Sequence, residues 1–114
     1  MRGDSTDLLQ GTLGLLILKA LLAGPDHGYG LARWIEDTTS DVLRIEEGSL
    51  YPALRRLEDR GWVRSQWGVS ENNRRARFYS ITPTGRTRLR NEAALWLRYA
   101  DAVRFVLRTV PALG

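Results

Sequence analysis

The residue types best suited to binding chemistry lie between positions 48 and 60, where hydroxyl groups and arginines share one side of a predicted helix. Leu50, Leu54 and Leu57 recur at helical spacing and form the apolar face of this helix. The opposite face carries Ser49, Tyr51, Pro52, Arg55, Arg56 and Asp59. Hydroxyls and small groups at the start of a helix, with arginines one turn later, suit contact with nucleic-acid bases and phosphates. A solvated amphipathic helix is the alternative interpretation.

Local signals place this helix between residues 49 and 60. Ser49 can cap its start, because a hydroxyl oxygen accepts a hydrogen bond from the free backbone N–H groups there. Pro52 is tolerated in the first turn, where the N–H groups lack helical partners anyway. Gly61 is expected to end the helix.

A second group of basic and amide side chains follows between two predicted strands, at residues 62–67 and 76–81. The polar segment between the strands predicts a hairpin loop. Arginine neutralises phosphates and enters narrow minor grooves, and asparagine donates to phosphate oxygens or base edges. The binding residues expected in the hairpin are Asn72, Asn73, Arg74, Arg75 and Arg77. The alternative is a hairpin that is merely kept soluble by its charge.

The formal net charge of +4 is unevenly distributed along the chain. Residues 1–43 hold 3 basic and 6 acidic groups, whereas residues 44–90 hold 11 basic and 5 acidic groups. Of the 17 basic residues, 16 are arginine, whose planar fork matches phosphate and guanine edges. A high-GC genome would explain arginine in place of lysine, but not the clustering. The pattern favours double-stranded DNA as the partner.

Composition excludes several other classes of protein. At 114 residues the chain is one small domain, and without cysteine it has no disulfides and fits a reducing, cytoplasmic compartment. The apolar run at residues 8–23 is too short to span a bilayer, and Asp4 and Asp7 before it do not suit a signal peptide. His27 is the only histidine and is expected to fix a turn or a helix start. We predict no membrane partner, no enzyme activity, no catalytic residue, no metal site and no cofactor.

The periodicity predicts four helices and two strands. The helices are expected from residue 5 or 6 to 23, from 27 or 28 to 38, from 49 to 60 and from 83 to about 109. Thr82 and Pro83 supply a cap and a first helical residue for the last helix. The inner side of the second helix is predicted to hold Tyr29, Leu31, Ala32 and Ile35. The order is that of a mainly α winged helix-turn-helix with a two-stranded β-wing, in residues 1–82, followed by a C-terminal dimerisation helix in residues 83–114.

The last helix carries a heptad pattern. Its apolar residues are spaced 4, 3, 4, 3, 4 and 3 apart and comprise Leu89, Ala93, Trp96, Ala100, Val103, Leu107 and Val110. This seam favours a homodimer, whose two-fold symmetry would present two recognition helices to a palindromic site. The alternative is that the helix packs back onto the core of its own chain.

Several motifs, in order, resemble the PadR-like family of bacterial transcriptional regulators. They are HGYGLA at 27–32, GSLYPALRRLE at 48–58, GWV at 61–63, RFY at 77–79 and ITPTGR at 81–86. The resemblance implies a winged helix that dimerises through its C-terminal helix and acts most often as a repressor. It also implies that Ser49 and Tyr51 lie at the DNA surface.

A single helix after the hairpin resembles the short subfamily. Some short members bind flat aromatic compounds between their C-terminal helices through a tryptophan, and Trp96 matches that position. A tryptophan in a heptad seam can also be core alone. Two rival functions follow: a sensor dominated by such an aromatic effector, and a winged-helix protein adaptor with no DNA site. The positive charge of residues 44–90 argues against the adaptor.

Overall fold

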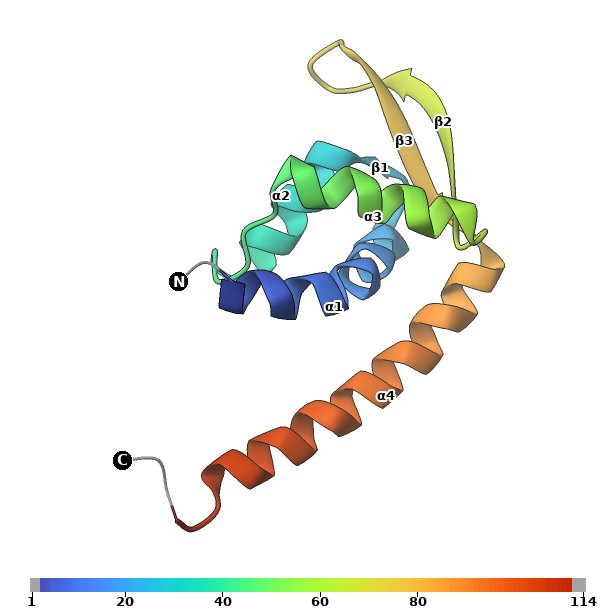
Figure 1. The fold of residues 1–114 in the computed structure, drawn as a ribbon. Coiled ribbons are helices and arrows are strands. Elements are labelled where there is room, and N and C mark those ends of the chain that lie inside the picture. The colour runs from blue at the N-terminus through green and yellow to red at the C-terminus, as the bar shows by residue number, and fades with distance from the viewer. Residues whose placement is uncertain (1–2, 112–114) are drawn as a thin grey trace.

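The computed structural model describes residues 3–111 of the chain (Figure 1). The elements follow in the order α1 (Gly3–Ala20), a 3-10 helix η1 (Leu21–Ala23), β1 (Asp26–His27), α2 (Gly28–Thr38), α3 (Glu47–Asp59), β2 (Val63–Val69), β3 (Arg75–Ile81) and α4 (Pro83–Arg108). The predicted order and the mainly α winged-helix fold are confirmed. Among residues 3–111, no helix combines the length and hydropathy needed to cross a membrane.

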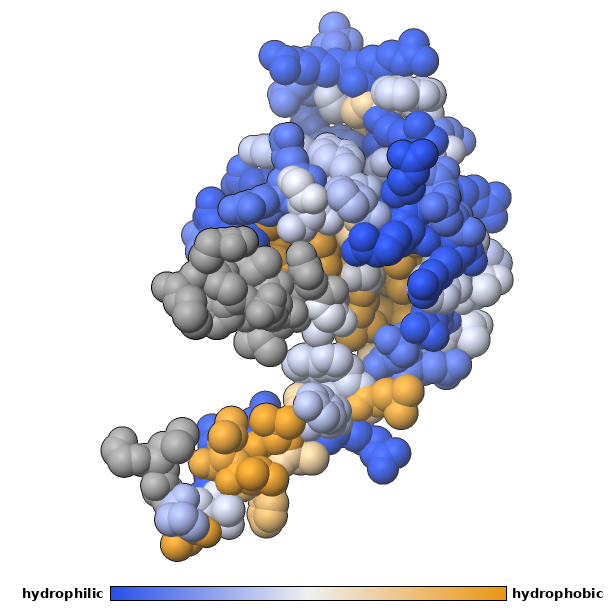
Figure 2. Space-filling model, in the orientation of Figure 1, coloured by the Kyte–Doolittle hydropathy of each residue, from blue (hydrophilic) through white to orange (hydrophobic). Residues whose placement is uncertain are grey.

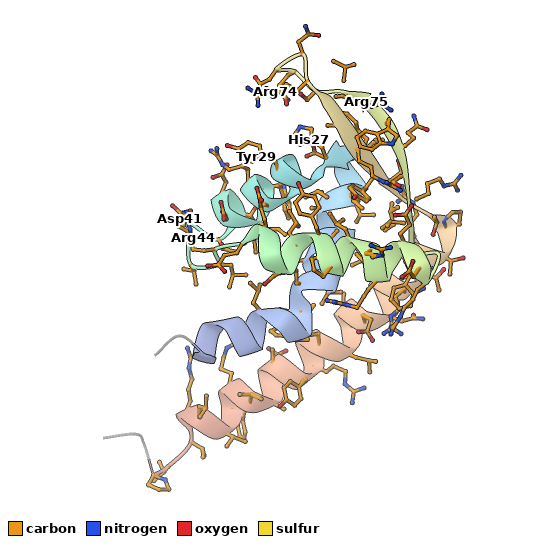
Figure 3. The ribbon with its side chains drawn as sticks, turned by 45° about the horizontal axis from the view of Figure 1, so that its top comes forward. His27, Tyr29, Asp41, Arg44, Arg74 and Arg75 are labelled. Atoms are coloured by element: carbon orange, nitrogen blue, oxygen red, sulfur yellow. The ribbon has the colours of Figure 1, made fainter. Side chains whose placement is uncertain are left out.

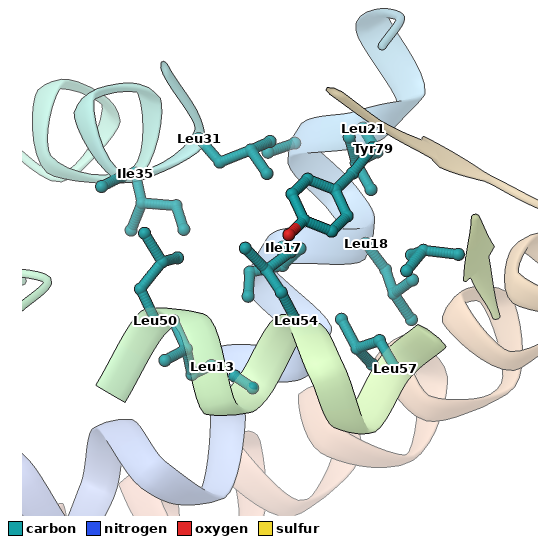
Figure 4. Close-up of a cluster of buried hydrophobic side chains, with 14 of the residues drawn as sticks. Leu13, Ile17, Leu18, Leu21, Leu31, Ile35, Leu50, Leu54, Leu57 and Tyr79 are labelled. Carbon is teal, nitrogen blue, oxygen red and sulfur yellow. The ribbon is translucent and has the colours of Figure 1, made fainter. Parts of the chain in front are cut away.

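Helix α1 lies at the centre of the core (Figure 4). Its buried face is made by apolar side chains three or four residues apart, as helical burial requires. These side chains are Leu9, Leu13, Ile17 and Leu18, and Leu21 of η1 continues the buried face. Leu31 and Ile35 of α2, the predicted leucines of α3 and Tyr79 of β3 close the core around them. The predicted inner side of α2 is confirmed except for Tyr29, which is 62% exposed.

Helix α3 begins two residues earlier than the sequence predicted. Its N-cap is Glu46, which makes no side-chain capping bond, so the prediction that Ser49 caps the helix is wrong. Glu47 occupies the first turn, where a carboxylate is stabilised by the helix dipole. This earlier start places Pro52 inside the helix and not in its first turn. Because proline has no N–H, the carbonyl of Gly48 loses its helical partner there.

The end of α3 and the start of α4 are joined by hydrogen bonds. Gly61 ends α3 as predicted, with a φ of 76°, and the Trp62 N–H donates to the Leu57 carbonyl at 3.0 Å. The Thr82 hydroxyl accepts from the Gly85 N–H at 2.9 Å, as predicted for the cap of α4, and donates to the Gly61 carbonyl at 2.7 Å. The Thr82 N–H donates to the Trp62 carbonyl at 3.0 Å. We call this set of bonds the α3–α4 clamp.

The sheet is antiparallel with the strand order β1–β3–β2. β2 and β3 form the predicted wing, with Trp67 opposite Arg77 and Val69 opposite Arg75. At the tip, Asn73 adopts a φ of 58°, a conformation that asparagine tolerates better than most residues. The two-residue strand β1 adds a third strand that the sequence did not predict, since so short a segment shows no alternation.

Helix α4 leaves the rest of the chain after its first turns and extends below α1 (Figure 1). Leu89 is 6% exposed and belongs to the core of its own chain, so it is not available to a partner helix. The later residues of the predicted seam are more open: Trp96 is 44% exposed and Leu107 is 55% exposed. α4 therefore has a packed beginning and an uncovered end.

Candidate nucleic-acid interface

The exposed face of α3 and the inner face of the wing enclose a groove of 680 Å³, which we call the α3–wing groove. It is lined by Tyr51, Pro52, Arg55, Glu58, Asp59, Arg77 and Tyr79. Burial raises the pKa of the Tyr79 hydroxyl above its ordinary 10.0, so this group remains protonated at neutral pH. The groove therefore combines two arginines and two carboxylates with aromatic hydroxyl groups.

The predicted residues of α3 lie on two flanks of the helix. Tyr51 and Arg55 face the wing, and Arg55 is exposed. Ser49, which is half-buried, and Arg56, which is exposed, line a separate hollow on the other flank of α3. Pro52 lies between the flanks and lines both hollows. The exposed surface of α3 is thus wide enough to contact a partner on both sides of its axis.

Tyr51 is held in place by the start of α2. Its ring passes so close to Gly28 that a Cβ added there would lie 2.8 Å from the Tyr51 hydroxyl oxygen. Any side chain at position 28 would displace the ring, which links the HGYG and GSLYPAL motifs in space. A Cβ at Gly30 would likewise collide with the carboxylate of Asp26, which accepts from the His27 N–H at 2.8 Å.

His27 connects α2 to the tip of the wing (Figure 3). Its Nδ1 accepts from the Gly30 N–H at 3.0 Å, which confirms the predicted role at a helix start. Because Nδ1 is the acceptor, Nε2 carries the proton and donates to Glu71 Oε1 at 3.1 Å. This hydrogen bond lowers the pKa of the Glu71 carboxyl group. The contact with the wing was not predicted, since the two residues are far apart in sequence.

The five predicted wing residues occupy two kinds of position. Asn72, Asn73 and Arg74 are exposed at the tip of the wing, and the exposed Arg75 follows at the start of β3 (Figure 3). Arg77 is nearer the base and is held by other side chains. Its Nε donates to Ser65 Oγ at 2.8 Å. A terminal nitrogen of Arg77 lies 3.6 Å from Glu58 Oε2. Arg77 thus joins the wing to α3.

Trp67 was not among the predicted site residues. Its ring is 55% exposed and lies beneath two guanidinium groups, 4.7 Å from that of Arg75 and 5.8 Å from that of Arg77. Trp67 lines a second hollow of 600 Å³ together with Tyr51, Arg75 and Arg77. We call it the wing hollow; it shares Tyr51, Arg77 and Tyr79 with the α3–wing groove. Strand alternation that puts Trp67 and Arg77 on one face could have identified it.

The start of α2 contributes a further exposed pair beside the wing hollow. Tyr29 lines that hollow, and its hydroxyl oxygen accepts from the Arg33 guanidinium at 2.9 Å. Tyr29 was predicted on the inner side of the second helix. Its spacing of four residues from Arg33 is the sequence signal that indicates a pair on the helix surface. Among the residues whose side chains the structure describes, no cluster of His, Cys, Asp or Glu could hold a metal ion.

Four of the remaining predicted residues, Trp96, Ala100, Val103 and Leu107, line an apolar groove of 790 Å³ between α1 and α4. This α1–α4 groove is lined by Leu9, Gly11, Thr12, Leu15, Leu16, Leu43, Trp96, Tyr99, Ala100, Val103, Arg104, Leu107 and Arg108. Figure 2 shows the hydrophobic surface exposed along the lower arm formed by α4. Ala93 is half-buried and Val110 is 88% exposed.

A three-helix core with a basic wing after its third helix defines a winged-helix protein. Residues 17–91 match the transcriptional regulator PadR-like family, and the chain belongs to this family. It is therefore a DNA-binding transcriptional regulator and not an enzyme. This confirms the family resemblance and the class of function expected from the sequence.

The fold is shared with solved regulators. A transcriptional regulator from Clostridium thermocellum is 28% identical, with a TM-score of 0.81 over 90% of this chain and 99% of that chain. A PadR family transcriptional regulator from Eggerthella lenta is 33% identical, with a TM-score of 0.77 over 94% of this chain and 91% of that chain. A 37.1 kDa protein in a transposon of Streptomyces fradiae is 39% identical over 89 residues, which are 78% of this chain and 24% of that protein.

Proposed function

We propose that the protein is a homodimeric repressor that binds a palindromic operator in double-stranded DNA. The observation that carries the proposal is that Tyr51 and Arg55 of α3 share one groove with Arg77 of the wing. Helix α3 would enter the major groove, and the wing would follow the backbone or an adjacent minor groove. Residues 1–82 would form the DNA-binding unit and residues 83–114 the dimerisation helix. The proposed DNA contacts are Ser49, Tyr51, Pro52, Arg55, Arg56, Asn72, Asn73, Arg74, Arg75 and Arg77.

The uncovered end of α4 supports dimerisation. Trp96, Val103 and Leu107 face the α1–α4 groove, which is apolar and open to solvent in a single chain. A second copy of α4 is the occupant that we propose, because the heptad spacing of one α4 matches that of another. The proposed interface comprises Ala93, Trp96, Ala100, Val103, Leu107 and Val110.

Selection of duplexes from a random DNA pool tests this function, followed by titration of the recovered operator at several salt concentrations. A dimer that neutralises roughly 6–10 phosphates should lose about 10³-fold or more in affinity between 50 and 200 mM salt. The recovered sites should be palindromic. A nearly flat salt response, or recovery of no preferred sequence, would contradict the proposal.

The position of Trp96 supports a second proposed function, which is to bind a planar aromatic effector at the dimer interface. Its ring is 44% exposed and lines the α1–α4 groove, whose other walls are mainly apolar. An effector there would change the packing of α4 and release DNA. Titration with planar aromatic compounds should quench tryptophan fluorescence and lower operator affinity, and Trp96→Ala should abolish both responses. Equal responses in wild type and Trp96→Ala would exclude this site.

A further inference from the structure

The wing carries an exposed tryptophan that contributes nothing to the core. Trp67 lies on the same face of β2 as the buried Val63, because side chains two residues apart share a face. Near the base, that face packs on the core. At Trp67 the same face no longer packs on the core, and the ring is 55% exposed. Hydrophobic burial within this chain therefore does not explain an indole at this position.

The contacts of Trp67 are with arginines. The guanidinium of Arg75 lies 4.7 Å from the ring centroid, a distance at which a cation is attracted by the face of the indole. Within residues 3–111, the side chain of Arg75 makes no hydrogen bond and no ion pair, so the ring is the group that orients its guanidinium. Arg77 also lies near the ring but is already held by Ser65 and Glu58. Trp67 therefore leaves the N–H donors of Arg75 free for a partner.

The position of the ring indicates which partner. Trp67 and Tyr51 line the same hollow, so the ring faces the side of the molecule that carries the α3–wing groove. Three arginines, Arg74, Arg75 and Arg77, line the hollow against one carboxylate, that of Glu71. A flat apolar ring between cations suits the backbone of a nucleic acid, where phosphates alternate with apolar deoxyribose edges.

We propose that Trp67 belongs to the DNA-binding surface: it orients Arg75 toward a backbone phosphate and packs against the adjacent deoxyribose. The inference rests on the proposed function and extends it to a residue of the wing. Arg75 is then the phosphate ligand, and Trp67 is both its positioning residue and a contact of the sugar. Arg77 has a different task, which is to hold the wing against α3.

The test compares Trp67→Leu with wild type by operator titration. Leucine stays apolar but has no aromatic face, so affinity should fall roughly threefold to tenfold, the range for losing one or two exposed cation–π contacts. Trp34→Leu is the matched control, because Trp34 is 39% exposed on α2 and stacks on no arginine among the described residues. This control should leave affinity unchanged. Trp67→Phe keeps a smaller ring and should fall between leucine and wild type.

A double variant distinguishes positioning from unspecific damage. If Trp67 acts through Arg75, the loss in Trp67→Leu/Arg75→Ala should be smaller than the product of the two single losses. Operator DNA should also protect part of the wild-type fluorescence from acrylamide, and that protected part should be missing in Trp67→Leu. The inference is overturned if Trp67→Leu binds the operator as tightly as wild type, or if the two losses are fully independent in the double variant. Either result would leave the proposed operator binding intact. Failure of the wild type to bind any duplex overturns the proposed function itself.

Discussion

The winged part of the molecule and the distal half of α4 treat their apolar side chains in opposite ways. In the winged part, Ile17 and Leu54 are fully buried. In distal α4, Leu97 is 61% exposed and Phe105 is 75% exposed. The winged part therefore buries its apolar side chains within one chain, whereas the apolar side chains of distal α4 have no covering surface. Changes in α4 should therefore alter assembly, and changes in the groove should alter DNA binding alone.

The largest effect is expected from a charge in the α4 seam. Val103→Glu would bury an unpaired carboxylate in each subunit, which is costly in an apolar interface. The variant should sediment as a monomer and lose about 10²-fold or more in operator affinity, because two linked half-sites no longer act together. Ala94→Glu, on the exposed opposite side of α4, is the matched control and should remain dimeric. If Val103→Glu still sedimented as a dimer, distal α4 would not be the surface through which the chain assembles.

The next largest effect should come from Tyr51 and should leave assembly intact. Tyr51→Ala should lower operator affinity by ~1–3 kcal/mol if the side chain makes a base or ordered backbone contact. Tyr51→Phe keeps the ring and separates the role of the hydroxyl from that of the ring. Sedimentation of both variants should match that of the wild type. Unchanged affinity and sequence preference in Tyr51→Ala would exclude α3 as the reading helix.

Gly28→Ala tests the seat of Tyr51 without altering a proposed DNA contact. The added Cβ would lie 2.8 Å from the hydroxyl oxygen and 2.9 Å from a ring carbon of Tyr51, so the ring must move. Operator affinity should fall, but by no more than in Tyr51→Ala. The substitution should have no further effect in a Tyr51→Ala background, and isothermal titration of the four proteins measures this coupling. If the affinity losses of Gly28→Ala and Tyr51→Ala were instead independent in the double variant, Gly28 would not act through the Tyr51 ring.

The wing arginines should divide into two groups. Arg74→Ala should weaken binding to all sequences similarly and lower the salt slope by about 1, as expected for one phosphate contact. Its thermal stability should be unchanged, since the Arg74 side chain forms no ion pair among the described residues. Arg77→Ala should also lower the free energy of unfolding, by less than ~1 kcal/mol, because its pair with Glu58 is partly exposed. Equal unfolding free energies for Arg74→Ala and Arg77→Ala would show that the contact of Arg77 with Glu58 does not stabilise the fold.

The smallest effects on DNA affinity are expected from His27 and Glu71, whose contacts act on the stability of the fold. His27→Ala should cost ~0.5–2 kcal/mol of stability through loss of the α2 cap, and His27→Asn should restore the cap but not the wing contact. The hydrogen bond from His27 lowers the pKa of Glu71 below its ordinary 4.5. A carboxyl group with a lowered folded-state pKa stabilises the fold above its unfolded pKa, and this contribution is lost as pH falls through the folded-state value.

Glu71→Gln should therefore be slightly less stable than wild type above pH 4.5, and the two should converge in more acidic solution. Glu71 is exposed, which keeps the difference small. Thermal unfolding of both proteins from pH 7 down to pH 3 measures it. A difference that grows on acidification would show that the contact with His27 does not stabilise the carboxylate.

Local rules predicted much of this fold. Gly61 and Thr82 mark helix ends because a left-handed glycine and a hydroxyl cap act through bonds within a few residues. The start of α3 was misplaced because Ser49 has the side chain of a typical N-cap, whereas the helix already begins at Glu47. The contact of His27 with the wing, the seat of Tyr51 on Gly28 and the burial of Leu89 could not be predicted, since each depends on segments brought together by tertiary folding.

The α3–α4 clamp couples the position of α3, the proposed recognition helix, to that of α4, the proposed dimerisation helix. The Thr82 hydroxyl and backbone N–H donate to the carbonyls of Gly61 and Trp62, directly after α3, and Gly85 packs so closely that a Cβ there would collide with the Trp62 carbonyl oxygen. If two copies pair through α4, the angle at which the paired helices cross is converted directly into the distance between the two α3 helices. The crossing angle of the paired α4 helices would then determine the spacing of the operator half-sites, although α4 itself lies away from the DNA.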